Sequence, residues 1–217
     1  MVNVYILCEG QTEEQFVKQV LYPYLLKYGI FSIPVIFATR RTAAKKFRGG
    51  VSDYGKIKDQ IIRLARSHPN EYVTTMLDYY GLSGTILGKN HDINDLIRRI
   101  EEIESNVDQD LGLPNCFFNL MVHEFEAILF SNIDVFRQIT DGPTVSRIQA
   151  IRTAYPSPEF IDDSPDTAPS KRIKSLIPAY KKVADGIVLA ERIGIDRILQ
   201  ECSHFRAWVG KIRALTG

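Results

Sequence analysis

Two acidic residues stand directly after short apolar segments in this 217-residue chain, Glu9 in VNVYILCEG and Asp78 in EYVTTMLDYYG. An acid at the carboxyl end of a strand in an open α/β sheet lies where such sheets bind ligands. Mg²⁺ and Mn²⁺ prefer carboxylate oxygens, and such an ion can orient a phosphodiester and stabilise charge during its cleavage. The alternative is that these acids only cap helices or face solvent. The spacing therefore suggests a shared divalent-cation site and leaves the structural alternative open.

The segments around these acids predict a small parallel sheet. Residues 2–7, 32–38, 72–77 and 116–122 are apolar and rich in β-branched or aromatic residues, which is typical of strands. Residues 12–25, 54–66 and 93–103 carry apolar side chains at helical spacing, and Pro23 should bend the first of these helices or mark its last turn. The β-α-β-α-β order with short connections favours a parallel, Rossmann-like sheet with helices on both faces.

The pattern changes from about residue 134 onward. Helical segments are expected near 134–140, 144–153, 170–182, 184–190, 194–201 and 203–215, with a Pro- and Asp-rich surface loop at 155–169. We therefore predict an α/β domain over residues 1–133 and a helical C-terminal half, residues 134–217, packed on it.

One dense basic cluster follows the second predicted strand, in a segment expected to be a loop. On the ligand-binding side of the sheet these side chains could hold a nucleic-acid backbone, although a solvated surface loop is the alternative. The cluster comprises Arg40, Arg41, Lys45, Lys46 and Arg48.

Composition limits the other classes of function. The formal net charge is +1, so a general positive coating for nucleic acid is excluded and any polyanion site must be local. Three widely spaced cysteines suggest neither a disulfide framework nor a zinc site. We expect no membrane span, and because Met1 leads directly into a strand without a signal-like leader, a cytoplasmic protein.

Several stretches resemble known families. The run LCEGQTE at 7–13, after a strand and before a helix, is similar to the glutamate motif of Toprim domains, which occur in topoisomerases, primases and related nucleases. The whole chain resembles the prokaryotic family DUF4276, through CEGQTEEQF (8–16), TTMLDYYGL (74–82), VHEFEAILF (122–130), DDSPDTAPSKRI (162–173) and ECSHFRAWV (201–209). The resemblance implies a Toprim-like fold and an ATPase partner in phage defence.

The resemblance implies roles for only a few residues. Glu9 matches the Toprim glutamate, and Asp78 matches the first acid of the Asp-x-Asp motif, but Tyr80 stands in place of the second acid. A replacement ligand would have to come from elsewhere. The candidates are Glu124 and Glu126, which follow the fourth predicted strand. Because residues two apart on a helix face different sides, we expect only one of them, Glu124, to face the site.

Two functions from different classes follow. The first is Mg²⁺- or Mn²⁺-dependent hydrolysis of a nucleic-acid phosphodiester, with Glu9 as ligand or general base, Asp78 as ligand and Glu124 completing the shell. The second is a non-catalytic regulatory or binding subunit that keeps the fold without a complete metal site. The absence of a second acid at Tyr80 favours the second function.

Overall fold

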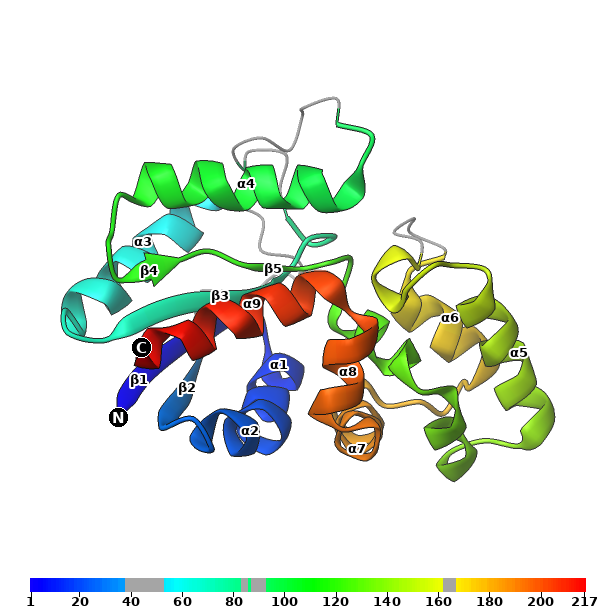
Figure 1. Cartoon of the computed structure of the whole chain (residues 1–217). Coiled ribbons are helices and arrows are strands. Elements are labelled where there is room, and N and C mark those ends of the chain that lie inside the picture. Colours follow the sequence, from blue (N-terminus) through cyan, green and yellow to red (C-terminus); the bar gives the residue numbers. More distant parts are fainter. Residues whose placement is uncertain (38–52, 83–85, 87–92, 162–166) are drawn as a thin grey trace, which may run out of the picture.

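The computed structural model describes residues 1–37, 53–82, 86, 93–161 and 167–217 and confirms the predicted α/β class (Figure 1). Its sheet has the order β2-β1-β3-β4, with β5 also paired to β3, and every pairing is parallel. The strands are β1 (Val2–Cys8), β2 (Ile30–Ile36), β3 (Tyr72–Asp78), β4 (Cys116–Phe117) and β5 (Leu120–Met121). Because β1 and β3 are neighbours and run in the same direction, their carboxyl ends lie side by side.

Helices make up most of the remaining described residues. The α-helices are α1 (Gln11–Phe16), α2 (Tyr22–Leu26), α3 (Tyr54–Ser67), α4 (Leu96–Leu111), α5 (Gly142–Thr153), α6 (Pro169–Leu176), α7 (Lys182–Ile193), α8 (Ile195–Glu201) and α9 (Ser203–Arg213). Shorter 3₁₀ turns are η2 (Phe125–Ser131), η3 (Ile133–Gln138), η4 (Pro158–Phe160) and η5 (Ala214–Thr216). None of the helices among the described residues is long and apolar enough to cross a bilayer.

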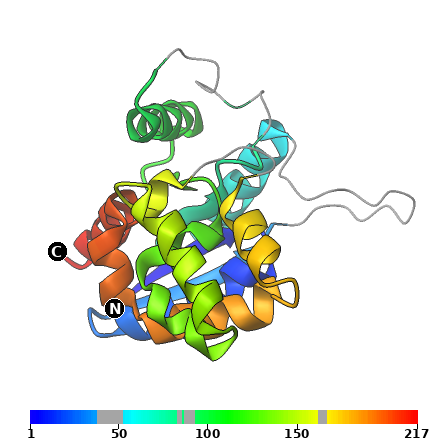
Figure 2. The same ribbon diagram turned by 90° about the vertical axis from the view of Figure 1, so that its right-hand side faces the viewer.

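The sheet separates two apolar cores. Helices α3 and α4 cover one face, where Ile61 and Ile103 pack against Leu77. Helices α1, α2 and α7–α9 cover the other face, where Trp208 and Ile187 share a core with Ile6. This second core joins residues from both predicted domains, although the domain boundary itself stays a prediction. Figure 2 shows α5 and α6 in front of the sheet, beyond the carboxyl ends of its strands.

The fourth predicted strand is divided in two. Instead of one strand over 116–122, β4 and β5 are separated at Phe118 and Asn119. The Thr75 hydroxyl donates to the Asn119 carbonyl (2.6 Å) and accepts from the Asn119 N–H (2.9 Å). At this point the Thr75 side chain, rather than the backbone of β3, makes the hydrogen bonds to the neighbouring segment. The apolar pattern of residues 116–122 does not reveal this interruption.

The first predicted helix is continuous but irregular. A π-helix, Val17–Leu21, connects α1 to α2, and the Tyr22 N–H donates to the Val17 carbonyl. Pro23 follows in the first turn of α2. Because proline cannot donate a backbone hydrogen bond and its ring crowds the preceding turn, a widened turn before it is physically reasonable.

Candidate functional site

The two acids identified from the sequence do meet at the carboxyl edge of the sheet. The Asp78 N–H donates to Glu9 Oε2 (3.1 Å), which fixes the Glu9 carboxylate against the end of β3. Asp78 is 8% exposed, and its Oδ1 accepts from the Phe125 N–H (3.1 Å). Adjacent parallel strands thus bring together residues far apart in the sequence.

Glu13, from the first turn of α1, belongs to the same group. It is buried, and its Oε2 accepts from the Gly10 N–H (3.0 Å), as in a capping box. The turn between β1 and α1 therefore presents Glu9 and Glu13 on one side. The sequence did not single out Glu13 as a candidate ligand, because helix capping alone explains an acid at that position.

The segment after β5 contributes Glu124 and Glu126. Glu124 accepts hydrogen bonds from the Ser170 N–H and from Ser170 Oγ (3.1 Å), so it anchors the start of α6. Glu126 is fully buried, and its Oε2 lies 3.0 Å from Lys182 Nζ. His123, just before them, adopts a left-handed backbone conformation (φ 66°), which turns the chain sharply into this segment.

Lys182, at the start of α7, is the cation of this group. Its Nζ also lies 3.9 Å from Asp78 Oδ2 and 4.0 Å from Glu13 Oε1. Among the described residues, no other Lys or Arg side chain comes within 4 Å of these carboxylates. Burial opposes the charged form of Lys182, but Asp78, Glu126 and Glu13 outweigh it and raise its pKa.

Three acids of this group have raised pKa values, because the nearby positive charge offsets their burial only in part. Burial raises the pKa of Glu9, and the charge of Glu13 adds to this, while the Asp78 N–H opposes it. Burial raises the pKa of Asp78 well above its usual value, against the pull of Lys182. Burial likewise raises the pKa of Glu126 to about 7, with Lys182 opposing. These shifts all indicate a centre that favours additional positive charge.

A cavity of about 300 Å³ opens beside this group. It is lined by Glu9, Gly10, Gln11, Thr12, Glu13, Asp78, Lys182 and Val183. We call these residues, together with Glu124 and Glu126, the acidic centre.

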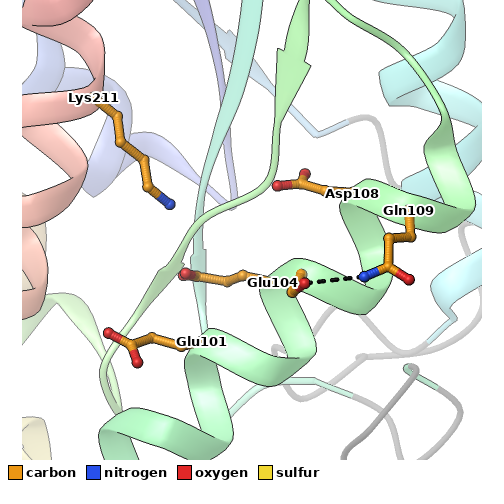
Figure 3. Close-up of a pocket in the computed structure, with 6 residues that line it drawn as sticks. Glu101, Glu104, Asp108, Gln109 and Lys211 are labelled. Atoms are coloured by element: carbon orange, nitrogen blue, oxygen red, sulfur yellow. Dashed lines mark hydrogen bonds between the residues drawn. The ribbon is translucent and has the colours of Figure 1, made fainter.

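A larger cavity of about 570 Å³ lies between α4 and α9, where Figure 3 shows Lys211 facing Glu104 and Asp108. There Glu104 and Asp108 accept the N–H groups of Leu120 (2.8 Å) and Phe118 (2.6 Å), so a structural role explains them.

The oxygen donors of the acidic centre are those that Mg²⁺ or Mn²⁺ prefers, but their placement does not form a finished site. In the part of the chain that the structure describes, no three His, Cys, Asp or Glu side chains are positioned to hold a metal ion together. The Lys182 ammonium lies between three of the carboxylates instead. The predicted basic cluster, Arg40, Arg41, Lys45, Lys46 and Arg48, lies outside the described residues.

Gly186 of α7 is closely packed behind the acidic centre, with no room for a larger side chain. A Cβ built there would lie 2.8 Å from Tyr180 Oη and 3.6 Å from Phe125 Cε1. Gly186→Ala should therefore lower the free energy of unfolding by about 1–3 kcal/mol in urea denaturation. Gly210→Ala is the matched control in α9, where a Cβ meets nothing within 4 Å, and it should stabilise the protein by about 0.5–1 kcal/mol. Equal stabilisation by both variants would contradict this packing.

Comparison with models of protein families identifies the family of this chain. It matches the family described as Domain of unknown function (DUF4276) over residues 8–213, and it therefore belongs to that family. The match includes every residue of the acidic centre. Comparison with curated proteins found no match, and comparison with solved structures found none.

Proposed function

We propose that this protein is a metal-dependent hydrolase of nucleic-acid phosphodiesters, related in fold to Toprim nucleases. One observation carries the proposal: five carboxylates, from Glu9, Glu13, Asp78, Glu124 and Glu126, gather near the carboxyl ends of β1 and β3, and a single ammonium lies among three of them. Buried acids that outnumber their counter-ions are costly unless they are protonated or a further cation is bound.

The residues of the acidic centre have distinct parts in this proposal. When bound, Mg²⁺ would stabilise negative charge on the phosphate. Glu9 lines the cavity and is fixed by the Asp78 N–H, and its raised pKa brings it closer to the range in which a carboxylate accepts a proton from water. Glu124 holds α6 against the centre through Ser170. Within the described ranges of the chain, the carboxylates are not arranged around a metal ion in this conformation.

The partners proposed with this activity come from the family resemblance. They are nucleic acid as the substrate, contacted by Arg40, Arg41, Lys45, Lys46 and Arg48, and an ATPase subunit within a phage-defence module. A cytoplasmic location belongs to the same proposal, because that is where such a substrate would be met.

Cleavage of labelled single- and double-stranded DNA and RNA with Mg²⁺ or Mn²⁺ tests the proposal. Asp78→Asn should reduce the rate about a hundredfold or more, since it removes charge from the centre while keeping the side-chain shape. Asp59→Asn, an exposed position on α3, should leave the rate unchanged. Cleavage that Asp78→Asn does not reduce would contradict the assignment of the site.

One observation favours a second function, that of a non-catalytic binding or regulatory subunit. Lys182 already neutralises part of the acidic centre, as expected where an internal ion pair takes the place of a bound metal ion. Absence of both cleavage and divalent-cation binding in the wild type would support this second function.

A further inference from the structure

The Lys182 ammonium lies among three carboxylates of the acidic centre. It lies 3.0 Å from Glu126 Oε2, 3.9 Å from Asp78 Oδ2 and 4.0 Å from Glu13 Oε1. These three carboxylates come from three separate elements, η2, β3 and α1. Lys182 therefore places a positive charge at the point on which three independently positioned acids converge.

Glu126 supplies an independent observation. Its side chain is fully buried, and within the described residues neither carboxylate oxygen makes a hydrogen bond of good geometry. Lys182 Nζ lies 3.0 Å from Oε2, and the Glu126 backbone N–H also favours the charged carboxylate, so both interactions satisfy it only in part. A buried carboxylate with an unpaired oxygen is costly, and one ammonium relieves that cost only in part. A divalent cation at the same point would satisfy both the charge and the oxygen.

We propose that Glu13, Asp78 and Glu126 form the divalent-cation site, and that the Lys182 ammonium and the divalent cation occupy it in turn. This inference rests on the proposed metal-dependent function. It adds Glu13 to the candidates named from the sequence, takes Glu126 rather than Glu124 as a ligand, and explains why the site is not arranged around a metal ion here. Two cations at one point repel each other, so binding of the ion requires the ammonium to leave.

Lys182 has a route out of the centre. Its side chain is 36% exposed, it lines the 300 Å³ cavity, and it stands in the first turn of α7. Rotation of this side chain toward solvent requires no movement of the helix. With the ammonium gone, Glu13, Asp78 and Glu126 would hold the ion, and their side chains would have to close on it, because Mg²⁺ requires oxygen ligands at about 2.1 Å.

Calorimetric titration with Mn²⁺ tests the competition. Lys182→Met keeps the length of the side chain and removes its charge, so it should bind Mn²⁺ about tenfold or more tightly than the wild type, the size of effect that a unit charge at this distance has on proton affinity. Lys182→Arg keeps the charge and should show no gain. Lys181→Met, at the exposed neighbouring position, is the matched control and should bind like the wild type.

The outcomes separate this inference from the proposed function. Equal affinity of wild type and Lys182→Met, or weaker binding by the variant, would overturn the competition and leave a metal centre in place. Absence of Mn²⁺ binding in both proteins would overturn the metal centre itself.

A second measurement needs no variant and so does not depend on how well Lys182→Met folds. Mg²⁺ should increase the acylation rate of Lys182 by an amine-specific reagent, measured by mass spectrometry, because the displaced amine loses its carboxylate partners. The acylation of Lys181 should not change. Unchanged or slower acylation of Lys182 in Mg²⁺-bound protein would contradict displacement.

Discussion

Trp208→Ala should lower the free energy of unfolding by about 3–5 kcal/mol, the largest change expected from one substitution in this protein. The Trp208 side chain of α9 is 2% exposed, and its Nε1 donates to Thr74 Oγ1 in the middle of β3 (2.9 Å). The substitution removes the largest side chain in the core beneath the sheet and leaves the buried Thr74 hydroxyl without this donor.

Trp208→Phe separates the two contributions. It keeps most of the apolar contact, including that with Phe205, and loses the hydrogen bond, so we expect a loss of about 1–2 kcal/mol. Far-UV circular dichroism in urea is the appropriate measurement, because Trp208 is the single tryptophan of the chain and its fluorescence is lost with it. A loss below 1 kcal/mol for Trp208→Ala would show that α9 does not share the core of the sheet.

Glu159→Ala should lower the free energy of unfolding by about 2–4 kcal/mol. Glu159, in η4, is 3% exposed and accepts from the His204 N–H (3.1 Å), the Phe205 N–H (2.9 Å) and Ser203 Oγ (3.2 Å). It thus caps α9 from a distant part of the chain, and the adjacent N-cap residue, Cys202, makes no side-chain cap hydrogen bond. Its removal leaves two N–H groups at a buried helix end without an acceptor.

The companion variant for this prediction is Glu159→Gln. It retains one acceptor oxygen and loses the charge, so thermal or urea denaturation should place it between the wild type and Glu159→Ala. A Glu159→Ala protein as stable as the wild type would show that water or another residue replaces the carboxylate at the start of α9.

The sequence was informative where local patterns determine structure. The strands before Glu9 and Asp78 and the turns after them follow from apolar runs ended by polar residues, and parallel pairing of β1 with β3 brings the two acids together. The interruption between β4 and β5 was not predictable, because it depends on a side chain of another strand, Thr75, entering the ladder.

The rest of the acidic centre depends on tertiary packing. Lys182 was expected at the end of a helix over 170–182, but α6 ends at Leu176 and Lys182 begins α7, which directs its ammonium into the centre. Between Glu124 and Glu126, the sequence favoured Glu124. The structure places Glu126 against Lys182 and Glu124 against Ser170, because residues two apart in the turn into η2 face different neighbours. No local pattern distinguishes these two partners.

The most direct test of the central claim is calorimetric titration of the wild type and Glu9→Gln with Mn²⁺. Glu191→Gln, at an exposed position on α7, serves as the matched control. A divalent-cation centre predicts binding by the wild type and the control and a loss of affinity of about tenfold or more in Glu9→Gln, because one of the acids at the edge of the sheet has lost its charge. Binding of equal strength by all three proteins, or by none, would contradict it.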